Sequence, residues 1–151
     1  MPVNKLKEFL EENQVKFQTI NHSTAYTAQE IAALTHVPGE QMAKTVIVKM
    51  DGKMAMVVLP ASRQIDFDRL EQAAGADNAE LAKESEFEKL FPDCERGAMP
   101  PFGNLYDMDV YVDEALAGDE KIAFNAGTHT QLLRMAYADY ERLVKPRKIR
   151  L

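Results

Sequence analysis

Few residues in this chain have types and spacings that could support chemistry. The three histidines, His22, His36 and His129, lie far apart, and a single cysteine cannot form a thiolate cluster, so no zinc-site spacing is present. The glycine-rich phosphate loop, the dinucleotide-binding fingerprint and the nucleophile elbow of serine hydrolases are also missing from the sequence. The sequence therefore predicts neither a bound metal nor a cofactor.

Two single side chains remain as candidates for chemistry. Cys94 lies beside Glu95 and Arg96, but a nucleophilic cysteine needs a histidine brought close by the fold, so a structural thiol is favoured. Lys44 begins an apolar strand, and a lysine at the mouth of a strand can hold a phosphate as a point charge. A lysine at a sheet edge with its ammonium group in solvent fits the same pattern equally well.

The segment GAMPPFG, residues 97–103, contains two glycines and two prolines within seven residues. Proline fixes φ and removes a backbone donor, whereas glycine adopts backbone conformations that other residues avoid. Such a loop is either a structural corner or a binding surface made of backbone atoms. The turn NAGTHT, residues 125–130, raises the same question, because its histidine could contact a substrate or simply be exposed.

The composition limits the class of protein. The chain has 151 residues, is 46% hydrophobic and 28% charged, and carries a net charge of −6. This size is typical of one domain, and we expect residues 1–151 to form one. The acidic charge argues against DNA as a partner, and no segment approaches the ~20 apolar residues that cross a membrane. A single cysteine fits the reducing cytoplasm.

The basic tail KPRKIRL, residues 145–151, departs from this acidic balance. We expect a solvated, frayed chain end. A contact with phosphate is the alternative interpretation.

Periodicity and capping signals predict a mixed order of elements. Helices are expected at 4–13, 27–34, 66–74, 85–91 and 136–144, and strands at 16–21, 105–113, 121–127 and 130–135. Residues 44–60 predict a hairpin in the middle of a sheet, with Asp51-Gly52 as its type I′ turn. Asp66 and the pair Ser85 and Glu88 are expected to cap helices. We therefore predict an α+β fold with a single mixed, curved, barrel-like β-sheet surrounded by helices.

Three segments in this order resemble the YbaK/prolyl-tRNA synthetase-associated domain family. They are AKTVIV at 43–48, RGAMPPFG at 96–103 and AGTHTQLLRMAYADYERL at 126–143. The resemblance covers nearly the whole chain. It implies a free-standing aminoacyl-tRNA deacylase that removes a small amino acid, such as alanine, serine or cysteine, from a mischarged tRNA, with tRNA(Pro) expected.

The resemblance also implies which residues form the site. Residues matching the family's pocket lysine and its Gly-x-x-x-Pro loop are expected to act in catalysis: Lys44, Gly97, Ala98, Met99, Pro100 and Pro101. Residues in or beside these motifs are expected to bind substrate: Thr45, Phe102, Gly103, Ala126, Gly127 and His129. Near the first capped helix, Tyr26 and His22 are expected to contact substrate too, and a local turn-capping role is the alternative interpretation for His22. The expected partner is the acceptor end of aminoacyl-tRNA, and the resemblance leaves open whether a synthetase also binds.

This chemistry needs no side-chain nucleophile, because an aminoacyl ester is already activated. Backbone groups that position a water and the ester, with help from the terminal ribose hydroxyl, would suffice. The alternative is a non-catalytic module that binds an aminoacyl-tRNA end, a nucleotide or a synthetase. The sequence around His129 favours this alternative, because it matches the alanine-removing version of the family poorly. A hydrolase dependent on Cys94 is a weaker third reading.

Overall fold

The structure is a computed structural model. It describes residues 2–23, 30, 41–91, 94–95, 98–118 and 120–150. Apart from one residue, the helix predicted at 27–34 lies outside this part of the chain, as do Tyr26 and Gly97.

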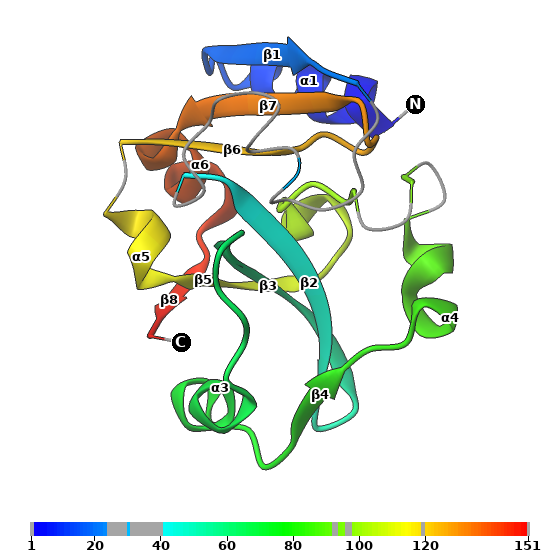
Figure 1. Cartoon of the computed structure of the whole chain (residues 1–151), viewed down its shortest axis with the longest axis vertical. Helices are drawn as coiled ribbons and strands as arrows, with labels where there is room; N and C mark the ends of the chain where they lie inside the picture. The colour runs from blue at the N-terminus through cyan, green and yellow to red at the C-terminus, as the bar shows by residue number, and fades with distance from the viewer. Residues whose placement is uncertain are drawn as a thin grey trace.

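The described strands form two sheets (Figure 1). The smaller sheet has the order β1-β7-β6, with strands β1 (Phe17–Asn21), β7 (Gln131–Ala136) and β6 (Lys121–Asn125), all antiparallel. The larger has the order β4-β2-β3-β5-β8, with strands β4 (Ala79–Leu81), β2 (Ala43–Met50), β3 (Lys53–Pro60), β5 (Asp109–Asp113) and β8 (Arg147–Ile149). It is mixed, because β5 runs parallel to both β3 and β8.

The prediction of an α+β fold is confirmed, but a single barrel-like sheet is wrong. The two sheets meet at an isolated parallel bridge between Met42 and Ala123, and neither sheet closes on itself. Alternating patterns identify strands one at a time and do not determine which strands pair across the sequence. The sequence pattern therefore could not separate one curved sheet from two packed ones.

The helices cover the sheets at their faces and ends. They are α1 (Pro2–Glu12), α3 (Phe67–Ala74), α4 (Glu84–Phe87), α5 (Glu114–Ala117) and α6 (Tyr137–Val144), with 3₁₀ turns η1 (Glu88–Leu90) and η2 (Gly103–Leu105). None of these helices is long and apolar enough to span a membrane.

Two of the predicted local signals are confirmed. Asp51 and Gly52 both have positive φ, at 52° and 83°, as a type I′ turn requires, and the hairpin strands they join are central in the sheet. Asp66 caps α3 by accepting a hydrogen bond from the Arg69 N–H at 3.2 Å.

Two other local predictions are wrong. The helix at 85–91 changes to a 3₁₀ turn at Glu88, and its cap is the Glu86 carboxylate, which accepts from the Lys83 N–H at 3.1 Å. The basic tail is not frayed: Arg147–Ile149 form β8, and Ile149 is buried beside α3. The tail is held by pairing with β5, by burial of Ile149 and by ion pairs of Lys148 with Glu141 and of Arg150 with Glu114.

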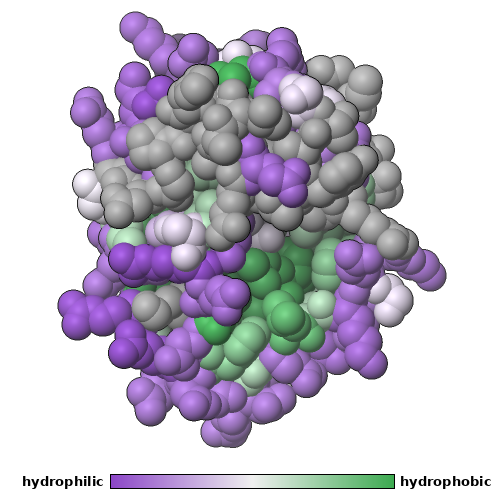
Figure 2. All heavy atoms as spheres, in the orientation of Figure 1, coloured by the Kyte–Doolittle hydropathy of each residue, from purple (hydrophilic) through white to green (hydrophobic). Residues whose placement is uncertain are grey.

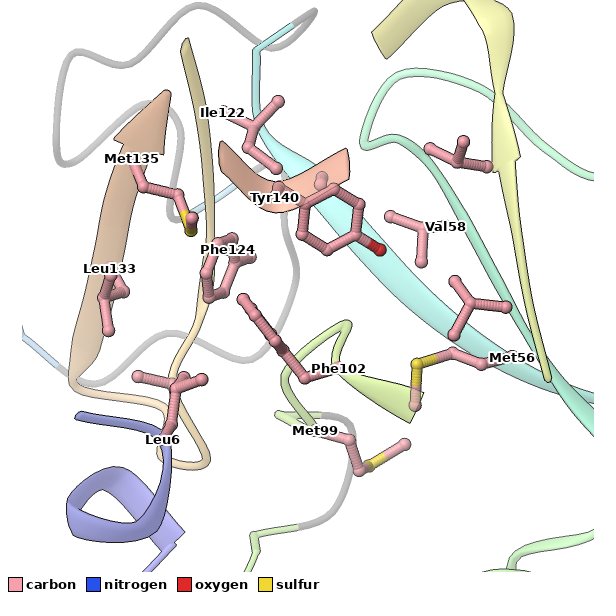
Figure 3. Packing of buried hydrophobic residues seen from close by; sticks show 14 of the residues in the cluster. Leu6, Met56, Val58, Met99, Phe102, Ile122, Phe124, Leu133, Met135 and Tyr140 are labelled. Atoms are coloured by element: carbon pink, nitrogen blue, oxygen red, sulfur yellow. The ribbon is translucent and has the colours of Figure 1, made fainter. Parts of the chain in front are cut away.

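The main core lies between the two sheets. Side chains from β6, β7, β2, β3 and β5 meet there, and α1 and α6 contribute Leu6, Leu10 and Tyr140 (Figure 3). A second cluster lies on the other face of the larger sheet, where Leu70 of α3 packs against Val48, Val57 and Leu59. Both faces of β2 and β3 are therefore covered over much of their length, which explains their nearly continuous apolar sequence.

Candidate functional site

The proline-rich loop at 98–103 is anchored in the core by its side chains. Every residue from Ala98 to Gly103 is buried. Phe102 has no exposed surface and packs edge-on against Phe9 and Tyr140, at centroid distances of 6.2 and 5.4 Å, and tilted against Phe124 at 5.5 Å (Figure 3). Such aromatic contacts stabilise a fixed geometry. Packing of its side chains in the core therefore fixes the backbone conformation of the loop.

Further contacts fix the end of this loop. The buried Tyr140 hydroxyl donates to the Pro101 carbonyl at 2.8 Å, and burial raises the pKa of Tyr140 well above its usual range. A Cβ atom on Gly103 would lie 2.5 Å from Val110 Cγ2 and 2.6 Å from the Met108 carbonyl oxygen. Gly103 is thus needed for close packing. Phe102 and Gly103, both predicted to bind substrate, face the core rather than open space.

The loop is joined to the small-residue turn after β6 by hydrogen bonds in both directions. The Gly127 N–H donates to the Ala98 carbonyl at 2.8 Å, and the Glu95 N–H donates to the Gly127 carbonyl at 2.9 Å. The Glu95 carboxylate also accepts from the His129 N–H at 2.9 Å. We call these three bonds the loop–turn clamp. They bring Ala98 close to Gly127 and His129, which lie 29 or more positions after it in the chain.

Glu95 is a residue that the sequence reasoning did not select. Its side chain is exposed, and a glutamate beside a glycine-proline loop reads as an ordinary solvated charge. No short-range pattern marks it, because its partner lies 34 positions away. Gly127 in turn has a φ of 100°, a conformation that residues with a Cβ rarely adopt.

His22 lies against the same turn. Its N–H donates to the Thr130 carbonyl at 2.9 Å, which continues the β1–β7 pairing to the edge of the turn. Its Nδ1 lies 2.7 Å from the Ser23 carbonyl oxygen, so Nδ1 carries the proton in the tautomer that makes this bond. Nε2 is then the acceptor. It is enclosed and has no hydrogen-bond partner among the described residues.

Lys44 and Thr45 point to opposite faces of β2. Lys44 is paired with Leu59, which belongs to the cluster under α3, whereas Thr45 is paired with Val58 of the main core. Thr45 therefore shares the face on which the proline-rich loop packs.

Lys44 lines a groove of about 260 Å³ that is otherwise mostly apolar. Its other lining residues, in the described part of the chain, are Val46, Gln64, Ile65, Phe67 and Leu81. Figure 2 shows a hydrophobic hollow over β2, between α3 and α4, where these side chains gather. Partial burial in this groove lowers the pKa of Lys44 below its usual 10.5.

The Lys44 groove and the loop–turn clamp share no lining residue in the described structure. The side of β2 that faces away from β3 extends from one to the other. Met42 bridges to Ala123 of β6, and the Ile47 carbonyl accepts from the Ala82 N–H at 3.0 Å. Between these two points this side of β2 pairs with neither β6 nor β4. Lys44 lies two residues after Met42 on β2. Two residues after Ala123, β6 ends at Asn125, just before the turn that the clamp holds.

The arrangement offers anchored backbone atoms and one lysine, rather than a nucleophile with its base. Within the described ranges, no three or more His, Cys, Asp or Glu side chains are grouped as metal ligands would be. Cys94 is half-buried, with its Sγ 3.7 Å from the Tyr106 hydroxyl. The geometry suits a reaction in which fixed dipoles position an ester that is already reactive.

Comparison with known proteins shows which chains this one resembles. The multifunctional Ser/Thr-tRNA deacylase ProXp-y of Escherichia coli (strain K12) is 26% identical over an alignment of 147 residues that covers 94% of this chain and 87% of that protein. A proline–tRNA ligase of Bacillus mycoides (strain KBAB4) is 27% identical over 89 residues, 59% of this chain and 16% of the ligase.

A crystal structure of a candidate trans-editing enzyme for prolyl tRNA synthetase covers 99% of this chain and 96% of its own, with a TM-score of 0.84 and 20% identity. At this identity the likeness shows the fold alone. A family model described as "Aminoacyl-tRNA editing domain" matches residues 22–143. The family predicted from the three sequence motifs is thereby confirmed: this chain belongs to the aminoacyl-tRNA editing domain family.

Proposed function

We propose that this protein is a free-standing deacylase that hydrolyses the ester of a small amino acid wrongly attached to tRNA. The family match carries the reaction class. The relative named as a Ser/Thr-tRNA deacylase is matched over 87% of its length, which supports a protein that acts without a synthetase domain of its own. The matched proline–tRNA ligase supports tRNA(Pro) as the tRNA and a synthetase as a further partner.

The observation that carries the mechanism is the loop–turn clamp, because it fixes backbone groups from two distant segments in one place. In the proposed reaction, a water oxygen attacks the ester carbonyl carbon, and the bond between that carbon and the ribose oxygen breaks. The ribose oxygen takes a proton that the attacking water gives up and leaves as a free hydroxyl, while the amino acid leaves as the acid. Holding water and ester in attack geometry can supply up to roughly 7–11 kcal/mol.

We assign the Lys44 groove to the terminal nucleotide of the tRNA, the one that carries the ester. Its apolar walls suit a base, and its single ammonium group suits a phosphate. The Ala98–Pro101 backbone and the turn at 126–129 would then face the ester across the stretch of β2 that pairs with neither β6 nor β4 in the described structure. Among small amino acids, serine is the first to test, because it is common to our expected set and to the name of the ProXp-y relative.

Purified protein should release serine, alanine or cysteine from mischarged tRNA(Pro) much faster than buffer does. Removing Lys44 as Lys44→Ala should lower kcat/KM roughly 10- to 150-fold, because hydrogen bonds to charged groups contribute about 1.5–3 kcal/mol. Lys44→Arg should recover part of the loss. Lys53→Gln removes an equal charge from the far end of the hairpin and serves as the matched control.

If the wild-type protein accelerates the loss of no aminoacyl ester in a panel of mischarged tRNAs, the proposed function is wrong. Equal activity of the wild type and Lys44→Ala would instead remove Lys44 from the site and leave the reaction class standing.

The Lys44 ammonium group should lose its proton at lower pH than the Lys49 ammonium group of the same strand. Burial lowers the pKa of Lys44, whereas the hydrogen bond to Glu86 at 2.6 Å raises the pKa of Lys49. Competitive acetylation over a pH series, read by mass spectrometry, gives both midpoints in one sample. A Lys44 midpoint at or above that of Lys49 would contradict the groove geometry.

A further inference from the structure

A second groove lies at one end of the smaller sheet, away from the clamped turn. Because β7 is antiparallel to both neighbours, the starts of β1 and β6 meet the end of β7 there (Figure 1). The groove has a volume of about 360 Å³. Lys16, Gln18, Lys121, Arg134 and Asp139 supply its polar groups.

The charge of this groove is opposite to that of the chain, whose net charge is −6. Three cations face a single carboxylate, Asp139, which already lies 3.4 Å from Arg142. Lys16, Lys121 and Arg134 take part in none of the ion pairs found in the described part of the chain, although carboxylates pair with cations at seven other places there. Unpaired cations that line one concavity attract an anion.

Arg134 still has donors to offer. One Nη group donates to the Gln41 side-chain oxygen at 3.2 Å, whereas Nε is enclosed and has no acceptor among the described residues. A guanidinium has five N–H donors, and its planar fork suits phosphate oxygens. Gln18 is paired with Arg134 across the β1–β7 ladder, which places an uncharged amide beside the guanidinium.

We infer that this groove binds the phosphodiester backbone of the tRNA acceptor stem, an inference that rests on the proposed function. Ala126 lies five positions after Lys121 along extended chain, which corresponds to ~17 Å. At about 3.4 Å per stacked nucleotide, this span covers roughly five nucleotides. A substrate whose ester lies at the clamped turn would therefore place the first base pairs of its stem, beyond the single-stranded 3′ terminus, at the three cations.

The first test measures binding alone, with an uncharged acceptor-stem minihelix as the probe. The slope of log Kd against log salt should fall by about 0.7–0.9 for each phosphate contact removed, so the double variant Lys16→Gln/Lys121→Gln should lose up to twice that. Both side chains are exposed, so melting curves should match the wild type. Lys53→Gln is the matched control and should keep the wild-type slope. An unchanged slope in the double variant overturns the inference.

The second test compares two substrates of different length. With an aminoacylated minihelix, the double variant should show a several-fold higher KM and an unchanged kcat. With an aminoacylated CCA trinucleotide, which is too short to reach the groove, the variant and the wild type should be equal. Equal impairment on both substrates overturns the stem assignment. If the wild type hydrolyses neither substrate, the proposed function fails, and the salt slope with uncharged RNA still decides whether the groove binds it.

Discussion

Replacing Phe102 with alanine will lower the free energy of unfolding by about 3–5 kcal/mol. The ring is fully buried and contacts Phe9, Phe124 and Tyr140, so its removal leaves a cavity at the centre of the main core. For a chain of this length, each kcal/mol shifts Tm by about 2–4 °C, which predicts a drop of roughly 6–20 °C. Urea denaturation followed by circular dichroism measures both quantities.

Phe87→Ala is the matched control, because Phe87 is only half-buried and its ring meets Phe91 at the edge of the core. It should destabilise the fold much less than Phe102→Ala. If the alanine variant of Phe102 does not fold, Phe102→Leu keeps the test open, since it retains most of the buried volume and should cost less. Equal losses for Phe87→Ala and Phe102→Ala would mean that the loop is not anchored through Phe102.

This anchoring shows that residues 98–103 form a structural corner, while their role as a binding surface stays a proposal. A structural corner and a backbone surface are not exclusive here. The side chains of Met99 and Phe102 point into the core, while the Ala98 carbonyl accepts a hydrogen bond from the turn at Gly127. The prolines and buried side chains hold the backbone still, and the described backbone is what the proposed chemistry uses.

Local signals in the sequence were sufficient for elements whose stability is local. The Asp51-Gly52 turn and the Asp66 cap depend on residues within four positions of each other, and the structure contains both. The three ordered motifs were sufficient to identify the family, because their residues stay in order along the chain.

Features that depend on distant partners could not be predicted. Arg147–Ile149 form a strand only because β5 has an edge to pair with, and the split into two sheets depends on which strands meet. Strand alternation alone puts Lys44 and Thr45 on opposite faces, but which of the two meets α3 and which meets the main core depends on packing between distant segments. Glu95 has no signature of its own, since its role comes from a backbone N–H far along the chain.

Glu95→Ala should lower kcat for deacylation by about 100-fold, with a much smaller change in KM. The variant removes the acceptor of the His129 N–H, so the two backbone bonds at Gly127 remain but the turn is no longer held at His129. Displacing reacting groups by ~1 Å can cost about 10²-fold in rate without any loss of direct contact to the substrate. Glu95 is exposed, so the loss of stability should stay near 1 kcal/mol, which unfolding curves can verify.

Two further variants at Glu95 show whether its side chain acts by positioning the turn or through its negative charge. Glu95→Gln keeps an oxygen at the same reach that can accept from the His129 N–H, so it should retain activity within about tenfold of the wild type, since a neutral hydrogen bond is about half as strong. Glu95→Asp keeps the charge but is one methylene too short, and it should resemble alanine. Glu12→Ala removes an exposed carboxylate from α1 and should change nothing. If Glu95→Asp is active and Glu95→Gln is not, the carboxylate acts through its charge, and the loop–turn clamp does not position the ester.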